Sequence, residues 1–317
     1  MNFRRLGQSD LHIAPIVLGG NVFGWGADEK TSFAIIDAFI DGGFNAIDTA
    51  NTYSRWVPGH KGGESETVIG NWIKAGGRRD KVIIATKLGE DMGRGRSLRK
   101  DDVMREAEDS LKRMSIDCID LMQTHFDDDV TPPEETMAAY ARLIEQGKVR
   151  FIGASNVSPA RIEESLAASD RLGVPRYQSV QTLYNLHDRN PFEKTYAAFC
   201  QKHKLSVLTY FSLAAGFLTG KYRSAEDTAK SKTRGGRVKA YFDARGIAIL
   251  KALDEVAGRH SATPTQVALA WLIARPGVTA PIASATSLAQ LDDILKSAQL
   301  KLLAEDMATL DTASRPA

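Results

Sequence analysis

Polar side chains of complementary chemistry follow short apolar runs of the chain. Asp48 ends one run, Tyr53 lies five residues further on, and Lys87 and His125 end the next two runs. A phenol with a pKa of about 10 is a poor proton donor at neutral pH, and we expect the nearby Lys87 ammonium to lower that pKa. Asp48 could pair with Lys87, while His125 could donate a hydrogen bond to a carbonyl oxygen. This set suits the protonation of an oxyanion as a hydride reaches its carbon.

The next apolar runs end in polar residues as well, namely Ser155, Asn156, Gln181 and Tyr210. One such residue is usually structural, but consecutive runs that each end in one predict a polar cavity. The chain has no nucleophile elbow of a hydrolase, and these side chains do not form the ligand set of a zinc site. We therefore expect no metal. One alternative stays open, in which Lys87 is the Schiff-base lysine of an aldolase barrel.

Eight short runs rich in β-branched residues alternate with amphipathic segments, which predicts parallel strands joined by helices. The expected strands are residues 15–18, 44–48, 82–86, 118–123, 149–154, 178–181, 206–210 and 278–282. The expected helices are residues 29–40, 65–74, 102–113, 133–146, 159–172, 192–203, 245–259 and 264–274. This order predicts an α/β protein with a (β/α)₈ TIM barrel, in which the carboxyl ends of the strands gather the polar residues at one rim.

Other segments complete the expected architecture. Residues 3–6 and 11–13 flank a turn and predict an N-terminal β-hairpin that could plug one end of the barrel. Residues 50–63 and 223–244 are long loops, and such loops in a compact domain are usually functional or disordered. The sequence shows no interdomain linker, so we expect a single barrel domain over residues 1–317 with extra helices.

Composition narrows the function classes. The 317 residues carry 41 Lys and Arg against 39 Asp and Glu, a balance that argues against a strongly basic nucleic-acid binder. Two cysteines do not make a disulfide framework. The chain has no apolar stretch of about 18 residues, and its N-terminus lacks the apolar core of a signal peptide. We expect a cytoplasmic protein that acts on a small molecule, with no membrane or nucleic-acid partner and an oligomeric state that the sequence leaves open.

The segments that carry these residues resemble the aldo-keto reductase superfamily, and in particular its bacterial branch with a long loop after strand seven. The matching strings are FNAIDTANTY, VIIATKLG, IDLMQTH, GKVRFIGASN and YFSLAAGFLTGKY, and the likeness runs over residues 4–309. Asp48, Tyr53, Lys87 and His125 match the catalytic tetrad of that family in order and spacing.

The resemblance implies a role for each residue of the predicted site. Tyr53 would be the general acid in the reduction of an aldehyde or ketone, assisted by Lys87 and Asp48, and His125 would orient the carbonyl. The resemblance also implies a nicotinamide cofactor. Ser155, Asn156 and Gln181 would bind its carboxamide, Tyr210 would stack on its ring, and Leu213, Gly216 and Lys221 would lie near its pyrophosphate. The further cofactor contacts would be Gly20, Asn21, Asp48, Ser212, Ser284, Thr286, Gln290 and Asp293.

Two departures from the family pattern bear on the cofactor. Phe211 follows Tyr210 where the family often has serine, and residues 282–294 hold no Lys or Arg to neutralise a 2′-phosphate. The resemblance to the family favours NADPH as the cofactor, with NADH as the alternative. Lys230, Lys232, Arg234, Arg237 and Lys239 form a basic run that is either a solvated loop or a cover for the phosphates.

Aromatic residues in the predicted rim loops could form the wall of an apolar carbonyl pocket, namely Trp25, Trp56, Phe126 and Tyr184. The function predicted from the sequence is NAD(P)H-dependent carbonyl reduction by hydride transfer. The alternative is a cofactor-bound sensor or adaptor with little turnover, like the family's potassium-channel β-subunits, and an intact tetrad does not separate the two.

Overall fold

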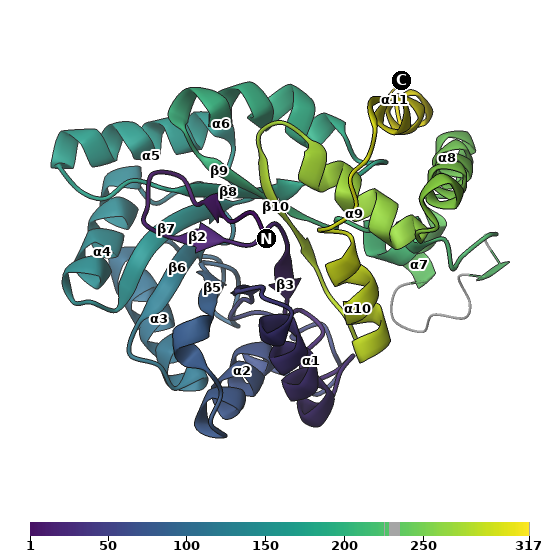
Figure 1. Ribbon diagram of the computed structural model, residues 1–317. Helices are drawn as coiled ribbons and strands as arrows, with labels where there is room; N and C mark the ends of the chain where they lie inside the picture. The colour runs from purple at the N-terminus through teal and green to yellow at the C-terminus, as the bar shows by residue number, and fades with distance from the viewer. Residues whose placement is uncertain (225, 228–234, 317) are drawn as a thin grey trace.

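The computed structural model describes residues 1–224, 226–227 and 235–316, and its centre is a closed barrel of parallel strands (Figure 1). The strands lie in the order β10-β3-β4-β5-β6-β7-β8-β9 around the barrel. Their bounds are β3 Val17–Gly19, β4 Ala46–Asp48, β5 Ile83–Leu88, β6 Ile119–Thr124, β7 Val149–Ser155, β8 Ser179–Leu183, β9 Ser206–Tyr210 and β10 Val278–Ala283. The predicted (β/α)₈ barrel is confirmed.

Helices surround the barrel on its outer side (Figure 1). They are α1 Glu29–Asp41, α2 Glu64–Lys74, α3 Lys100–Met114, α4 Pro133–Glu145, α5 Pro159–Leu172, α6 Ala197–His203, α7 Gly235–Lys239, α8 Ala244–His260, α9 Pro264–Ala274, α10 Leu288–Lys296 and α11 Ala304–Ala313. Short 3₁₀ turns occupy Arg79–Lys81 and Ala214–Thr219. Because helices cover the outer face of each strand, the strands are apolar on both faces, and all residues of β4, β6 and β10 are buried.

The N-terminal hairpin closes the amino end of the barrel. Its strands β1 (Arg4–Arg5) and β2 (His12–Ile13) pair in antiparallel fashion. The Gly7 amide donates to Ser206 Oγ at 2.7 Å, and Ser206 begins β9. The apolar hairpin side chains pack into one buried cluster with inward-facing strand residues, and the cluster includes Leu6, Leu11, Ile13, Val17, Ala46, Leu121 and Leu208. The predicted plug is therefore confirmed, and the opposite rim stays open for a site.

The sequence places a Ser or Thr before proline at Ser158, Thr263 and Thr131, which predicts three helix caps, and the structure confirms two of them. Ser158 and Thr263 precede proline, and each side chain accepts a hydrogen bond from the backbone three residues on. The expected cap at Thr131 is wrong, because α4 begins at Pro133 with Pro132 as its cap. Thr131 instead donates its hydroxyl to Asp128 Oδ2 at 2.5 Å, which braces the loop before the helix.

Other boundaries differ from the expectation. The predicted helix over residues 192–203 is a π-helical segment, Pro191–Tyr196, that leads directly into α6. No helix was predicted after the last strand, whereas α10 and α11 lie there. Ser287 caps α10 by accepting from the Gln290 amide, a start signal that the sequence contained.

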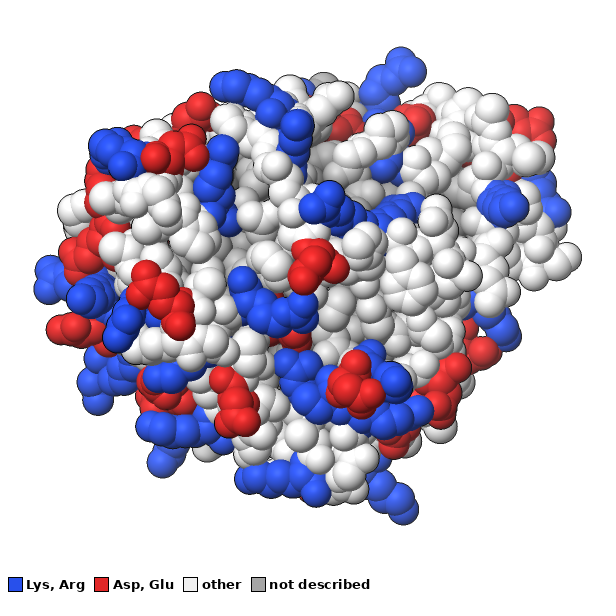
Figure 2. Space-filling model, turned by 60° about the vertical axis from the view of Figure 1, so that its left-hand side comes forward, with Lys and Arg blue, Asp and Glu red and all other residues white. Residues whose placement is uncertain are grey.

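The surface does not show a single-sign charge patch on the face drawn in Figure 2, where Lys and Arg alternate with Asp and Glu. Lys230, Lys232 and Arg234 of the basic run lie outside the described residues, while Lys239 is an exposed residue of α7. Within the described ranges, no helix combines the length and the apolar composition that a membrane span requires.

Candidate active site

A cavity of about 1010 Å³ opens at the carboxyl ends of the barrel strands. The end residue of β4, Asp48, lines it, as do His125 directly after β6 and Tyr210 at the end of β9. The cavity wall also includes the loop residues Tyr53 and Trp56, which follow β4. The strand ends therefore bring together residues that are far apart in the sequence, at the rim where ligands bind in this architecture.

Lys87 is the centre of a buried polar network beneath this cavity. Its Nζ atom lies 2.7 Å from Asp48 Oδ2, 2.7 Å from the Thr49 carbonyl oxygen and 2.8 Å from Tyr53 Oη. Asp48 and Lys87 are each 1% exposed. A buried charge is tolerated only with partners of this kind, so the ion pair holds both side chains in one geometry and presents the Tyr53 hydroxyl to the cavity.

The barrel register explains why these groups meet. Asp48 pairs with Ala85 on the neighbouring strand β5, and Lys87 lies two residues further along that strand with its side chain on the same face. Lys87 thus lies inside β5, which continues to Leu88, and not beyond the strand as predicted. The loop after β4 then turns back, and the Tyr53 hydroxyl reaches Asp48 Oδ2 at 3.3 Å.

The electrostatics at Tyr53 differ from the expectation. Burial of the phenol, followed by the negative charge of Asp48, raises the pKa of Tyr53 well above 10. The prediction that the pKa of Tyr53 is lowered is therefore wrong, because desolvation and the Asp48 carboxylate outweigh the Lys87 ammonium. Burial also lowers the pKa of Lys87, although Asp48 opposes that shift. Tyr53 therefore keeps its proton at neutral pH.

His125 lies beside Tyr53, with the two ring centres 6.1 Å apart. Burial lowers the pKa of His125 well below 6.5, and the positive charge of Lys87 adds to that shift. The imidazole is consequently neutral at neutral pH and carries one N–H. Its Nδ1 atom lies 3.5 Å from Thr52 Oγ1, a long contact that leaves Nε2 for another partner.

Gln181 and Gln123 complete the surroundings of Asp48. Gln181 Nε2 donates to Asp48 Oδ1 at 2.7 Å, and Gln123 Nε2 donates to the same oxygen at 3.2 Å. Gln123 was not predicted as a site residue, although a glutamine within the apolar run of β6 is a signal that could have indicated it.

A second series of hydrogen bonds links the carboxyl ends of β7 and β9. The Tyr210 hydroxyl donates to Asn156 Oδ1 at 2.7 Å, and Asn156 Nδ2 donates to Ser155 Oγ at 3.0 Å and to the His125 carbonyl oxygen at 3.1 Å. Asn156 adopts a positive φ of 52°, which asparagine tolerates better than most residues. Ser155, Asn156 and Tyr210 all line the cavity.

Most residues that were predicted to contact the cofactor line the cavity. Those that line it are Asn21, Asp48, Ser155, Asn156, Gln181, Tyr210, Ser212, Leu213, Gly216, Lys221, Ser284, Gln290 and Asp293. Gly20 and Thr286 are not among the described lining residues. Gly20 is held to Asp48 by a backbone hydrogen bond of 2.8 Å, and Thr286 donates its amide to Gln290 Oε1 at 2.9 Å.

Aromatic rings form the outer part of the cavity. Trp25 and Trp56 meet edge to face with ring centres 5.9 Å apart, and Phe126 lines another part of the wall. Tyr184 is the exception, because its side chain is fully buried against Phe192 and its hydroxyl donates to Glu193 Oε1 at 2.7 Å. The prediction that Tyr184 forms part of a substrate pocket is therefore corrected: it is a core residue.

Charged residues that the sequence analysis did not assign also line the mouth of the cavity. Arg55 and Asp91 form an ion pair of 3.3 Å there, and Glu90 accepts hydrogen bonds from Arg96. No signal in the sequence distinguished them from ordinary surface charges. In the part of the chain that the structure describes, no three His, Cys, Asp or Glu residues are grouped so that they could hold a metal ion.

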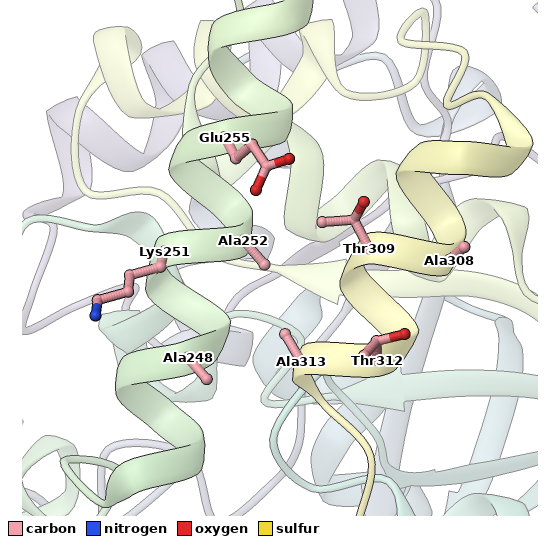
Figure 3. Close-up of a pocket in the computed structure, with 8 residues that line it drawn as sticks. All are labelled: Ala248, Lys251, Ala252, Glu255, Ala308, Thr309, Thr312 and Ala313. Atoms are coloured by element: carbon pink, nitrogen blue, oxygen red, sulfur yellow. The ribbon is translucent and has the colours of Figure 1, made fainter.

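A second hollow of about 620 Å³ lies between α8 and α11. Figure 3 shows the small side chains of Ala248, Ala252 and Ala313 along the gap, while Lys251 points away from it. Its polar groups do not converge on a common point, so it lacks the features of a catalytic site.

Comparison with known proteins agrees with this geometry. The profile described as "Aldo/keto reductase family" matches residues 15–315. Uncharacterized oxidoreductase YrpG of Bacillus subtilis (strain 168) is 32% identical over 98% of this chain and 95% of its own length. Aldo-keto reductase YhdN of the same organism is 33% identical over 93% of this chain and 86% of its own length. A protein of Arabidopsis thaliana named "Probable voltage-gated potassium channel subunit beta" is 29% identical over 94% of this chain and 91% of its own length. The chain belongs to the aldo/keto reductase family.

Proposed function

We propose that this protein reduces an aldehyde or ketone to an alcohol with NADPH, and that Tyr53 is the general acid. The observation that carries this proposal is the position of Lys87 Nζ, which lies within hydrogen-bond distance of both Asp48 and Tyr53. Tyr53 and His125 open onto the same cavity, where a carbonyl oxygen could approach both.

Tyr53 supplies the proton. Its raised pKa keeps the phenol protonated at neutral pH. The alkoxide oxygen that develops during reduction is more basic than a phenolate, so transfer from the Tyr53 hydroxyl remains downhill. Lys87 then stabilises the phenolate that is left, because its ammonium group lies 2.8 Å from that oxygen.

His125 orients the carbonyl. The neutral imidazole donates one hydrogen bond, and its place beside Tyr53 directs that bond at the oxygen that Tyr53 protonates. Two donors on one oxygen fix its position, and such positioning accounts for a large share of the rate enhancement in reactions of this kind.

The residues present fit a nicotinamide dinucleotide, which when bound supplies the hydride. Gly216 has a φ of 98°, and a Cβ atom there would lie 3.5 Å from Lys221 Nζ, so the glycine leaves a space beside a cation where a phosphate could lie. Ser155, Asn156 and Gln181 would hold the carboxamide, and the Tyr210 ring would stack on the nicotinamide. Ser212 and Leu213 would line the path towards the phosphates.

The preference for NADPH is the finer part of the proposal. The polar residues that line the cavity within residues 282–294 are Ser284, Gln290 and Asp293. Ser284 and Gln290 can donate hydrogen bonds to a 2′-phosphate but cannot neutralise it, and the charge of Asp293 opposes it. Lys221 is the cation that we assign to the cofactor phosphates. If its charge serves only the pyrophosphate, NADH would bind as tightly as NADPH, and this is the alternative.

The test is a titration of the protein with NADPH and with NADH, followed by protein fluorescence. Trp25 and Trp56 line the cavity and act as reporters. Turnover is then measured with the tighter cofactor and a panel of aldehydes and ketones. We expect tighter binding of NADPH and cofactor oxidation that depends on the carbonyl. Tight binding with no turnover on any carbonyl would contradict the proposed reductase activity.

A second candidate function is a cofactor-bound sensor or adaptor. The observation that favours it is the full-length similarity to the Arabidopsis protein named as a potassium-channel subunit. The same experiment separates the two functions, because an adaptor would bind the dinucleotide without appreciable carbonyl reduction.

A further inference from the structure

We propose that Gln123 is a positioning residue that orients the carboxylate of Asp48 and the amide of Gln181 together, and so couples the proton-donating network to the place where the cofactor carboxamide binds. This inference rests on the proposed function. It concerns a residue with no exposed surface, which is not among the residues that line the cavity.

The contacts of Gln123 form a closed triangle inside the barrel. Gln123 Nε2 donates to Asp48 Oδ1 at 3.2 Å, and Gln123 Oε1 accepts from Gln181 Nε2 at 3.2 Å. Gln181 Nε2 also donates to Asp48 Oδ1 at 2.7 Å. Each side of this triangle joins a different pair of strands among β4, β6 and β8, so it fixes the three side chains relative to one another.

The triangle divides the two oxygens of Asp48 between two tasks. Oδ1 accepts the two glutamine amides, while Oδ2 accepts from Lys87 at 2.7 Å and from Tyr53 at 3.3 Å. A carboxylate held on both oxygens does not rotate to present a different lone pair. Gln123 therefore contributes to the direction in which Asp48 holds Lys87 and Tyr53.

The triangle also fixes which end of the Gln181 amide faces the cavity. Its Nε2 atom is occupied by Asp48 and Gln123, and within the described part of the chain its Oε1 atom accepts no hydrogen bond. Gln181 lines the cavity. The oxygen is therefore the atom available to accept from the NH₂ group of a carboxamide, and reversal of the amide would break both existing bonds.

The fold makes room for this arrangement at Gly153. Gln123 pairs with Gly153 on β7, and Gly153 pairs with Ser179 on β8. A Cβ atom on Gly153 would come within 2.4 Å of Ser179 Oγ and 3.3 Å of Cγ of Gln123. The absence of a side chain on the intervening strand lets Gln123 reach across β7 to Gln181.

The first test compares Gln123→Leu with Gln178→Leu. Gln178 precedes β8 at the opposite end of the barrel, where its Oε1 accepts from the Gln8 amide, so it is a matched glutamine outside the site. We expect Gln123→Leu to raise the Kd for NADPH and to lower kcat/KM, each about tenfold or more, since one hydrogen bond to a charged group and one to a neutral amide are lost. Gln178→Leu should leave both within about twofold, the level of a distant surface change.

The second test uses a pH profile, which a purely structural role would not change. Gln123→Glu places a second carboxyl group against Asp48, and two carboxylates in contact do not both ionise readily. While protonated, the new group can donate to Asp48 as the amide does. Once ionised, it repels Asp48. We expect kcat/KM of this variant to fall as pH rises, through an ionisation that wild type and Gln178→Glu lack.

The ionisation of a glutamate at position 123 should depend on the charged and titratable groups around that position. Asp48 on β4 is hydrogen-bonded to the side chain of Gln123, and Lys87 on β5 pairs with that residue in the strand register. Tyr53 reaches it only through Asp48, and His125 follows two residues along the chain. Gly153 and Gln181 on the other side are uncharged. The far-end variant Gln178→Glu faces none of these groups, so it controls for a general effect of added charge.

The outcomes distinguish this inference from the proposed function. Wild type that binds NADPH and reduces carbonyls, together with a Gln123→Leu variant that does both equally well, would overturn the role of Gln123. A Gln123→Glu profile identical to that of wild type would overturn it as well. Wild type that binds the cofactor without turnover would instead overturn the proposed reductase activity, and the Kd of Gln123→Leu would still test the orientation of Gln181. Thermal unfolding of every variant confirms that the comparison is between folded proteins.

Discussion

At the scale of single residues, Asp48 organises the site. Four donors converge on its carboxylate, from Lys87, Tyr53, Gln123 and Gln181. Burial of a charged carboxylate costs free energy unless its hydrogen-bond partners are in place. The partners of Asp48 are already in place, so the site is preorganised for a ligand. In the proposed mechanism, Tyr53 and His125 would therefore not need to move to meet a carbonyl oxygen.

The electrostatics of Tyr53 and His125 predict the pH dependence of the reaction. Tyr53 must be protonated to act as the acid, and its pKa is raised, so reduction keeps its acid throughout the neutral and mildly alkaline range. His125 has a lowered pKa and stays neutral over the same range. We expect log kcat/KM for reduction to be nearly flat from about pH 7 to about pH 9, measured with a slow substrate so that chemistry limits the rate.

The reverse reaction supplies the control for that prediction. If Tyr53 is the acid in reduction, oxidation of an alcohol needs it as a phenolate, so the rate of oxidation should rise with pH where the reduction profile is flat. A reduction rate that falls with an apparent pKa near 7 would contradict the assignment of Tyr53 as the acid.

The sequence was enough to predict that these residues meet at one rim, but not the environment they meet in. The types and spacing of Asp48, Tyr53, Lys87 and His125 were enough to predict a proton-donating group beside a carbonyl-binding one. The direction of the Tyr53 pKa shift was wrong, because that shift depends on how much water the fold removes around the phenol. The role of Gln123 could not be predicted for a different reason: its contacts form only when three strands come together in the barrel.

At the scale of elements, α3 ties two active-site loops together. Glu106 on α3 is a buried carboxylate whose Oε2 accepts from Asn51 Nδ2 at 2.9 Å and from the Gly89 amide at 2.8 Å. Asn51 lies in the loop that carries Tyr53, and Gly89 begins the loop after β5. The helix therefore sets the separation of the two loops that form one side of the cavity.

Removal of this carboxylate should weaken both fold and function. Glu106→Ala leaves the Asn51 and Gly89 donors without a partner, which costs about 1–3 kcal/mol of unfolding free energy. We also expect kcat to fall, because the loop that carries Tyr53 loses its support. Chemical denaturation and steady-state kinetics measure the two effects.

Glu108→Ala on the same helix is the matched control. Glu108 pairs with Lys148 at the partly exposed surface, and such pairs contribute about 0–1 kcal/mol. Equal losses in the two variants would refute the special role that we assign to Glu106.

The strands show how far element prediction could go. Alternation of apolar and amphipathic segments was enough to identify the eight barrel strands and the helices between them, and cap residues at Ser158 and Thr263 located two helix starts. The end of β5 was predicted too early. A charged lysine usually marks the end of a buried strand, and only its buried partner Asp48 allows Lys87 to lie within β5. No helix was predicted after β10, although Ser287 is a cap signal for α10. The helix α11 begins at Ala304 behind Leu303, whose side chain cannot cap it, so its start carries a weaker signal in the sequence.

At the scale of the whole molecule, the cavity joins loops from nearly every strand of the barrel. Asn21, Asn156, Lys221 and Asp293 come from segments that are far apart in the sequence, yet all line it. A dinucleotide that contacts these loops together stabilises the folded state by mass action, by about 2.7 kcal/mol at a concentration of 100 Kd. The barrel itself was predictable from the order of its elements, whereas the shape of this cavity depended on loop conformation.

The cation on the cofactor side can be tested through that stabilisation. We expect NADPH to raise the Tm of wild type, and Lys221→Ala to weaken NADPH binding about tenfold and to reduce the Tm shift, since a charge-assisted contact to phosphate is lost. Lys251→Ala changes an exposed lysine beside the hollow between α8 and α11 and should bind NADPH as wild type does. A Tm shift in Lys221→Ala that equals the wild-type shift would show that its charge does not meet the phosphates.

The most direct test of the central claim is carbonyl reduction by Tyr53→Phe, measured beside its affinity for NADPH. The substitution removes one hydroxyl, whose partners are Lys87 at 2.8 Å and Asp48 at 3.3 Å, and leaves the ring that packs beside Trp56 and His125. We predict that turnover falls by about a hundredfold or more, the scale of a lost general acid, while the Kd for NADPH stays within about threefold of wild type, a change of less than about 1 kcal/mol. Reduction at the wild-type rate by Tyr53→Phe would contradict the account.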